Sequence, residues 1–324
     1  MSTKRSAGRL RWLSRKSLIV LTVPLLALAA ACGSGVESAS RAASSESLTT
    51  TARPAKQYKF ELIDVPGSVR TIVWDINDLG VAVGVFTDST GMGHGFMRTR
   101  NGVQQFDFPG ASSTTFLDVN NTGTAVGWYG DASGAQHGFK LSPDMTSAAI
   151  DFPGAANTYV GSINNRGDMV GSYGPTVDEG TGFLLQGGRF TTLADPPGAA
   201  PETNLPLGMN DLGTISGTFT DAAGAEHGFV LVDGTYTIVD PLGSSDGPDF
   251  ALAKINDLGN AVGSNGVDEG FIVNARTGRF STFSCPGGFA IRVRGINNRG
   301  QVTGGCRTGP GAPFVGFIAT PVDD

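Results

Sequence analysis

The 324-residue sequence has few charged side chains, few reactive side chains and no long hydrophobic run. Charged residues make up 16% of it, and it contains only three Cys and three His. Since 40% of the residues are hydrophobic and the mean hydropathy is near zero, the composition excludes a disordered acidic chain and a multi-span membrane protein. The sequence contains no Gly-x-Ser-x-Gly elbow, phosphate loop, His-Glu-x-x-His or Cys-x-x-Cys motif. No motif therefore names a reaction.

Glycine is the residue in excess, because 48 Gly and 17 Pro together make up about a fifth of the chain. The glycines follow no Gly-X-Y period, which excludes collagen. No segment of the main domain shows a helical period either, so we expect an all-β protein rich in turns.

The N-terminus resembles a targeting segment. All six cations of the first 31 residues precede an apolar run from Leu18 to Ala31, which contains Pro24 and is shorter than the roughly 20 residues of a spanning helix. Small residues then precede Cys32, as in a bacterial lipoprotein signal; an ordinary secretory cleavage site is the alternative. We expect a signal peptide over residues 1–31, and a lipidated Cys32 followed by a flexible Ser/Ala/Thr-rich tether over residues 32–57.

Cleavage before Cys32 leaves 17 Lys and Arg against 29 Asp and Glu, a net charge of −12. Such an acidic surface disfavours nucleic acid and anionic headgroups as partners. Attachment to the membrane would then depend on the acyl chains at Cys32. The expected location is a bacterial membrane, on its periplasmic or cell-surface side, and the expected state is a monomer.

Six internal repeats occupy the rest of the chain. Each contains a short apolar-Asn-Asn/Asp-x-Gly segment, a second Gly four residues later and then a Gly-Phe pair. The Asn residues recur at intervals of 41 to 46 residues. The six segments are Ile76–Gly80, Val119–Gly123, Ile163–Gly167, Met209–Gly213, Ile255–Gly259 and Ile296–Gly300.

Each repeat reads as four β-strands joined by turns. In the second copy the expected strands are Thr114–Val119, Thr124–Tyr129, Gln136–Leu141 and Ala148–Phe152. Six four-stranded units predict a six-bladed β-propeller over residues 58–324. The last copy lacks a fourth strand, and residues 58–67 match one, so the N-terminal strand is expected to close the ring. A solenoid or paired sandwiches are the alternatives.

The repeats resemble the bacterial extracellular HAF repeat family, named for a His-Ala-Phe tripeptide. The tripeptide corresponds here to His94-Gly95-Phe96, His137-Gly138-Phe139 and His227-Gly228-Phe229. Thr181, Glu269 and Val315 replace His in the other copies, and Gly replaces Ala in all six. The resemblance implies an exported repeat protein without an established catalytic site, so it assigns no functional residue.

The three His all occupy this one repeat position on the third strand. The blade geometry separates them, so we expect each to pack beside its Phe and bond a turn rather than to share a metal ion. Cys285 and Cys306 follow strands whose loops emerge on one face of the propeller, and export favours disulfide formation, so we expect a structural disulfide between them.

Acidic residues recur in the loops between second and third strands, among them Asp88, Asp131 and Asp221. Turn formation is the favoured interpretation, and a site for Ca²⁺ or a cationic ligand is the alternative. The longest loops between blades add further polar residues on the same face, where a ligand surface would be sought first. These residues are Glu202, Asn204, Asp246 and Asp249.

Three functions are compatible with this pattern. The leading hypothesis is a surface-anchored binding or interaction module that meets a protein or a glycan. The alternatives are a propeller-type hydrolase or lyase that uses acidic loop residues, and a structural envelope protein. The sequence assigns no catalytic residue, no metal site and no cofactor.

Overall fold

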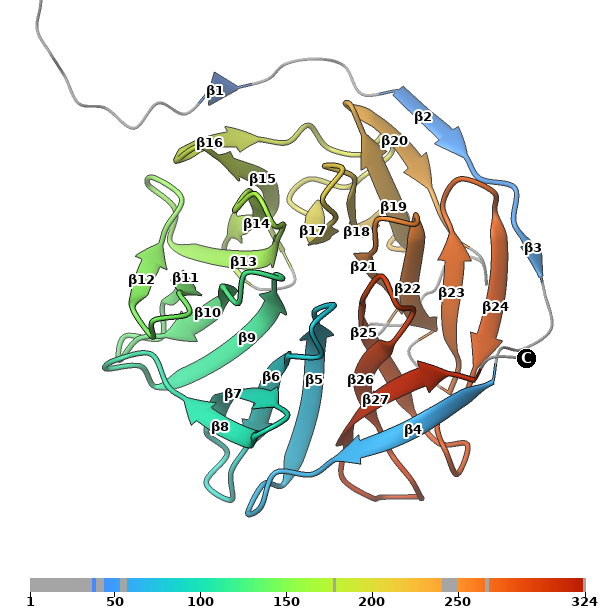
Figure 1. Cartoon of the computed structure of the whole chain (residues 1–324). Helices are drawn as coiled ribbons and strands as arrows, with labels where there is room; N and C mark the ends of the chain where they lie inside the picture. Colours follow the sequence, from blue (N-terminus) through green and yellow to red (C-terminus); the bar gives the residue numbers. More distant parts are fainter. Residues whose placement is uncertain are drawn as a thin grey trace, which may run out of the picture. The chain divides into compact units, whose positions relative to one another are not determined.

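The computed structural model describes residues 37–38, 44–52, 57–176, 179–240, 250–265 and 268–322, all within one compact unit of residues 34–324. Every regular element in these ranges is a β-strand, and six antiparallel four-stranded blades surround a common axis (Figure 1). The predicted six-bladed propeller is therefore confirmed. In the described part of the chain, no helix is long and apolar enough to cross a bilayer.

The four strands of a blade follow one another outward from the axis. The innermost strands are β5 (Arg70–Ile76), β9 (Ser113–Val119), β13 (Asn157–Ile163), β17 (Leu205–Met209), β21 (Phe250–Ile255) and β25 (Ile291–Ile296). The second strands are β6 (Ala82–Thr87), β10 (Ala125–Gly130), β14 (Met169–Gly174), β18 (Ile215–Thr220), β22 (Asn260–Asn265) and β26 (Val302–Cys306). The third strands are β7 (Gly93–Thr99), β11 (Gln136–Leu141), β15 (Thr181–Gln186), β19 (Glu226–Val232), β23 (Gly270–Asn274) and β27 (Val315–Pro321). The outermost strands are β8 (Gly102–Phe106), β12 (Ser147–Ile150), β16 (Arg189–Thr192), β20 (Thr235–Ile238), β24 (Arg279–Phe283) and β4 (Tyr58–Ile63).

The ring closes through the N-terminal strand, as the sequence predicts. β4 pairs antiparallel with β27, from Tyr58 opposite Pro321 to Ile63 opposite Gly316. Blade 6 thus consists of β25, β26, β27 and β4, and blades 1 to 5 follow in chain order from β5. This pairing covers the edge that β27 would otherwise leave open.

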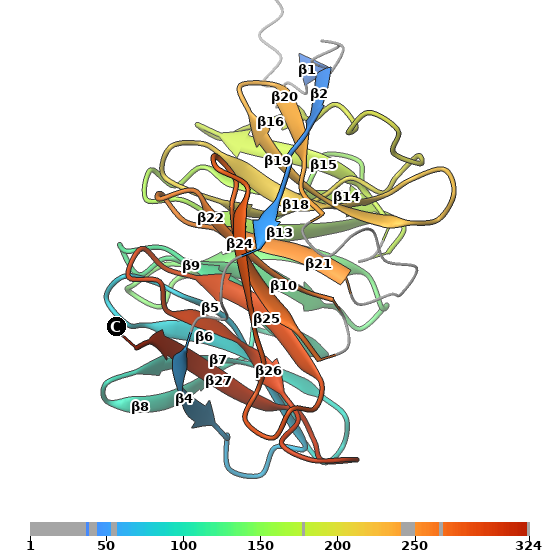
Figure 2. The same cartoon turned by 90° about the vertical axis from the view of Figure 1, so that its right-hand side faces the viewer.

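Part of the segment expected to be a flexible tether forms short β-strands at the edges of three blades. β1 (Glu37–Ser38), β2 (Ser44–Ser47) and β3 (Thr51–Ala52) pair in parallel with β16, β20 and β24, and Figure 2 shows β2 at the rim beside β20. The outer strand of a blade presents unpaired backbone N–H and C=O groups. A Ser/Thr-rich segment can bond to them through its backbone alone, without the apolar alternation that would have revealed a strand. Cys32 and the signal segment lie outside the described residues.

The repeated Gly and Phe residues pack each blade. The six repeated Phe side chains are all fully buried: Phe96, Phe139, Phe183, Phe229, Phe271 and Phe317. A Cβ on Gly84 would lie 2.1 Å from the Ile72 carbonyl oxygen and 2.9 Å from the Phe96 ring. Only glycine therefore lets the second strand approach the first strand and the Phe ring this closely.

The innermost strands carry a register shift just before the repeated Asn, for example between Val73 and Asp75 in β5. A bulge of this kind changes where a side chain is directed. Equivalent shifts occur in all six innermost strands. Successive strands of a meander reverse direction, so the Asn turns lie on one face of the ring, called here the turn face. Loops between second and third strands, and between blades, lie on the opposite face, called here the loop face.

Candidate functional site

The axis of the ring is polar, and the repeated Asn side chains form its first layer. Asn77 Oδ1 accepts hydrogen bonds from Leu79 N (3.0 Å) and Val81 N (2.9 Å), which fixes its own turn. Its Nδ2 donates to the Asn120 carbonyl oxygen of the next blade at 2.9 Å. The same bond to the next blade is made by Asn120, Asn210, Asn256 and Asn297, and Asn297 closes the ring on Asn77. Each repeated Asn therefore fixes its own turn, and five of the six also join their blade to the next; Asn164 Nδ2 instead donates to Asp168.

The following residue of each repeat forms a second layer at the mouth of the axial pocket. In all six blades its backbone N–H donates to the side-chain Oδ1 of the equivalent residue in the next blade, at 2.7 to 2.9 Å. The six residues are Asp78, Asn121, Asn165, Asp211, Asp257 and Asn298. The mouth therefore carries three carboxylates and three amides, already bonded to one another.

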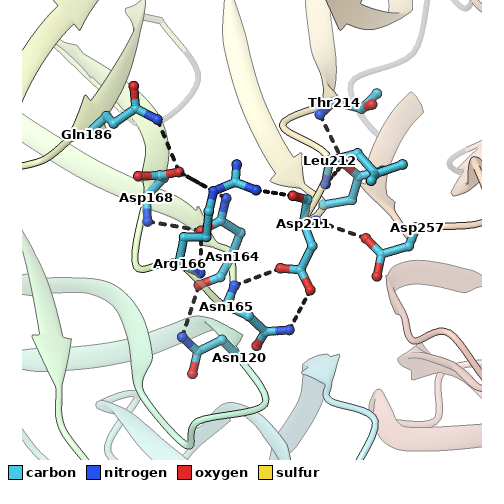
Figure 3. Close-up of polar contacts among 11 residues, drawn as sticks. Asn120, Asn164, Asn165, Arg166, Asp168, Gln186, Asp211, Leu212, Thr214 and Asp257 are labelled. Carbon is cyan, nitrogen blue, oxygen red and sulfur yellow. Dashed lines mark hydrogen bonds and ion pairs between the residues drawn. The ribbon is translucent and has the colours of Figure 1, made fainter.

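Figure 3 shows one part of this layer, where Asn165 meets Asp211. The Asn165 backbone N–H donates to Asp211 Oδ1 at 2.7 Å, and Asn165 Nδ2 donates to Asp211 Oδ2 at 2.5 Å. Arg166 bonds the Asp211 carbonyl oxygen and forms an ion pair with Asp168 at 3.1 Å. The carboxylates here are held by neighbouring donors, which is typical of a structural seam.

Below the mouth lies a third layer of residues, which come from the bulges of the six innermost strands. Unlike the first two layers, its residue types differ from blade to blade. Counted from blade 1, the residue two positions before the Asn is Asp75, Asp118, Ser162, Gly208, Lys254 and Gly295. Lys254 belongs to blade 5 and reaches across the axis to blade 2, where its Nζ lies 2.8 Å from Asp118 Oδ2. It also donates to the Gly161 carbonyl oxygen of blade 3 at 2.7 Å. Lys254 and Asp118 are about 95% buried, so this ion pair closes the axis.

Asp118 is the centre of this buried group. Its Oδ2 also accepts a hydrogen bond from the Ser162 hydroxyl and one from Ile163 N at 3.0 Å. Burial raises the pKa of Asp118, but Lys254 and the hydrogen bonds lower it more, so its net pKa lies below the usual value. Burial, and next the charge of Asp118, raise the pKa of Asp75 well above its usual value. Asp75 shares a hydrogen bond with Asp118, and the pKa values of these two carboxyl groups are shifted in opposite directions.

The pocket around these layers has a volume of about 80 Å³. That volume holds a few water molecules but no sugar ring or peptide segment, because ligand pockets usually measure several hundred Å³. Burial raises the pKa of Asp78 at the mouth, but hydrogen bonds from Asn121 and Asn298 lower it more, so this carboxylate is ionised. Among the residues the structure describes, no group of three His, Cys, Asp or Glu is arranged to hold a metal ion.

The acidic loop residues predicted from sequence lie on the loop face, away from this pocket. Asp88 Oδ1 accepts hydrogen bonds from Thr90 N (2.8 Å) and Met92 N (3.0 Å), so it fixes its own turn. The Thr90 hydroxyl, and then these backbone bonds, lower the pKa of Asp88 to about 2. Asp131 and Asp221 make equivalent bonds. The structure thus gives all three the turn-forming role.

The histidines join these turns to residues just after the outermost strands. His94 Nε2 lies 3.4 Å from Asp88, its Nδ1 lies 3.0 Å from Asp107, and its ring stacks on Phe86 with centroids 5.1 Å apart. His137 and His227 make the same pair of carboxylate contacts in blades 2 and 4. Each histidine therefore contacts its own turn, and the three remain in separate blades.

The structure describes the first of the two long loops between blades, residues 196–207. Glu202 is exposed with a positive φ of 58°, whereas Asn204 is fully buried and donates to the Ala194 carbonyl oxygen at 3.0 Å. Asn204 is thus a residue of the interior. Asp246 and Asp249 lie outside the described residues. Cys285 and Cys306 form a disulfide with Cα atoms 6.1 Å apart.

Sequence reasoning missed Asp75, Asp118 and Lys254. They stand two residues before the repeated Asn, where the six copies carry Asp, Asp, Ser, Gly, Lys and Gly. Aligning the repeats and asking where they differ would have found this position. The pairing of Lys254 with Asp118 cannot be found from such an alignment, because it depends on blades 5 and 2 facing each other across the ring.

No protein-family model and no curated protein sequence matches this chain. Similar solved structures include YCF48 bound to a D1 peptide, with 11% identity, 84% of this chain and 99% of that chain covered, and a TM-score of 0.44. AofleA from Arthrobotrys oligospora has 10% identity, 83% and 91% coverage, and a TM-score of 0.47. A fucose-specific lectin from Aleuria aurantia has 10% identity, 81% and 96% coverage, and a TM-score of 0.46. Such low identities transfer no function, and the class of this protein, a six-bladed β-propeller, rests on its own strand pairing.

Proposed function

We propose that this protein is an exported, lipid-anchored binding module that presents a rigid propeller at the bacterial cell envelope. The signal-like N-terminus, the small residues before Cys32 and the resemblance to HAF repeats support export and anchoring. The closed ring of blades supports the binding role, because it holds surface loops in fixed positions.

The Lys254–Asp118 ion pair across the axis is the observation that carries this proposal. It fills the centre of the ring, and the pocket above it is too small for a sugar or a peptide. Recognition is therefore assigned to the loop face and the rim, where side chains differ from blade to blade.

In-cell crosslinking of the full-length protein tests the binding role. The control carries Cys32→Ala behind a conventional secretory signal, so that it is exported without lipid. We expect a labelled fatty acid on the natural protein alone, and one dominant crosslinked partner. Absence of label from the natural protein would contradict anchoring. Recovery of copies of this chain alone would favour a structural envelope protein instead.

The Asp75–Asp118 pair favours a hydrolase or lyase as the second candidate function. Two neighbouring carboxyl groups whose pKa values are shifted in opposite directions are the arrangement that general acid–base chemistry uses. This candidate requires the axial pocket to open to substrate. Turnover of a glycan or ester substrate that disappears in Asp118→Asn, and persists in the loop-face variant Asp131→Asn, would establish it in place of a pure binding role.

A further inference from the structure

Arginines gather around two aromatic rings where blade 6 meets blade 1. The guanidinium carbons of Arg70, Arg292 and Arg307 lie 5.9, 5.1 and 4.7 Å from the centroid of the Phe314 ring. A fourth, that of Arg294, lies 4.7 Å from the Trp74 ring. The arginine–aromatic patch is defined here as Arg70, Trp74, Arg292, Arg294, Arg307 and Phe314.

The topology places most of this patch at the loop face, whereas Trp74 and Arg294 lie further along β5 and β25. Arg70 begins β5, and Arg292 follows the first residue of β25; both strands enter from the loop face. Arg307 and Phe314 belong to the loop that joins β26 to β27, also on that face. Arg70 and Arg307 are exposed, whereas Phe314 is buried beneath the arginines.

A disulfide and two backbone hydrogen bonds fix the backbone around the patch. The Cys285–Cys306 disulfide joins the loop before β25 to the end of β26, next to Arg307. Arg307 N donates to the Ala290 carbonyl oxygen at 2.9 Å, and Thr71 N donates to the Phe314 carbonyl oxygen at 2.9 Å. The patch is thus held in place before a ligand arrives, which reduces the entropy lost on binding.

The charge of the patch is opposite to that of the protein. Four of the 17 cations that follow Cys32 belong to it, and residues 65–74, 284–294 and 305–315 contain no Asp or Glu. Where the loops of other blades carry Asp88, Asp131 or Asp221, blade 6 carries Arg307. The patch therefore concentrates arginines on an otherwise acidic protein, which favours an anionic ligand.

We propose that the arginine–aromatic patch binds an oxyanion group, a phosphate, sulfate or carboxylate, of the module's ligand. Each guanidinium carries five donors in a planar fork that matches these groups. An arginine that already contacts its own protein therefore still offers donors to a ligand. Phe289, which is 37% exposed on the disulfide-bonded loop, adds apolar surface for the organic part of the ligand. This inference rests on the proposed binding function and names the chemistry that it recognises.

Trp74 supplies the readout, because its ring contacts Arg294. The mature chain with Cys32→Ala and Trp128→Phe contains Trp74 as its one tryptophan. Inorganic phosphate, sulfate and glucuronate are titrated separately against chloride at the same ionic strength. We expect a saturable change in Trp74 emission with at least one of the three, which identifies the oxyanion, and none with chloride.

The variants Arg307→Gln and Arg292→Gln should weaken the apparent affinity at least tenfold. Arg307→Lys keeps the charge without the fork and should give an intermediate affinity. The control is Arg100→Gln, an exposed arginine in the turn between β7 and β8 on the opposite face; it should bind as the parent does. Circular dichroism establishes that each variant is folded.

Equal responses to the oxyanions and chloride, or full affinity in folded Arg307→Gln, would overturn the inference. If this happens while in-cell crosslinking recovers a partner, the ligand chemistry is wrong and the proposed function stands. If oxyanion binding is found but no partner is recovered, the patch stands and the proposed envelope role falls.

Discussion

Replacing Lys254 with Met tests whether the axial ion pair holds the ring together. Met keeps most of the side-chain length but removes the charge, so Asp118 remains buried without its counter-ion. Lys254 and Asp118 are 6% and 5% exposed, with Nζ and Oδ2 2.8 Å apart. Breaking such a buried pair from one side costs about 3–5 kcal/mol of unfolding free energy.

The loss should depend on pH in a defined direction. In the natural protein the pKa of Asp118 is lowered, so its contribution to stability is present above the unfolded-state pKa of about 3.9 and lost as the pH falls through the folded-state pKa. Without Lys254, burial raises the pKa of Asp118 instead. The penalty in Lys254→Met is therefore greatest at neutral pH and shrinks on acidification, once Asp118 takes up a proton.

Urea unfolding at pH 7 and pH 4, followed by tryptophan emission and circular dichroism, measures both effects. Lys59→Met is the control, because Lys59 is exposed on β4; it should change stability by less than about 0.5 kcal/mol. Adding Asp118→Asn to Lys254→Met should recover part of the loss, since it removes the unpaired charge. A loss below about 1 kcal/mol at pH 7, or a larger loss at pH 4, would refute this account of the axis.

Three further predictions concern the seam, the disulfide and the histidines. Asn297→Ala removes the bond that closes the Asn layer and the cap of its own turn, so urea titration should show a loss of about 1–3 kcal/mol; an unchanged midpoint would contradict the seam. Replacing Cys285 and Cys306 with Ala should cost about 3 kcal/mol for a sequence separation of 21 residues, and reductant should then have no further effect. Burial lowers the pKa of His227, but neighbouring carboxylates raise it more. Its contribution is therefore full below about pH 6.5 and lost as pH rises through the folded pKa; His227→Gln should cost more at pH 6 than at pH 8, and equal costs in thermal melts would argue against this linkage.

The fold could be predicted because the same four-strand pattern occurs six times in the sequence. The strand expected at Gln136–Leu141 matches β11, and the match of residues 58–67 to a fourth strand identified the closure by β4. The edge strands β2 and β3 could not be predicted in this way. Their pairing is made by the backbone, so their Ser and Thr side chains carry no pattern that distinguishes a strand from a tether.

The site was harder to predict, because the residues that recur in every repeat are those that build the ring. The Asn turns and acidic loops attracted attention as repeated features, and the structure uses them for hydrogen bonds within turns and between neighbouring blades. Lys254 occurs once, and nothing near it in sequence indicates a partner 136 residues away. The arginine–aromatic patch joins residues from two blades that meet only when the ring closes.

The pairing of β4 with β27 also fixes the order in which the protein can be completed. β4 is the first blade strand to be synthesised and β27 the last, yet each is the other's neighbour. Contacts between such distant parts of a chain form slowly, because a long loop must close first. Five blades can assemble during synthesis, whereas the sixth waits for the last residues of β27. A chain that ends prematurely therefore leaves β4 unpaired, and a defect at one end exposes a strand at the other.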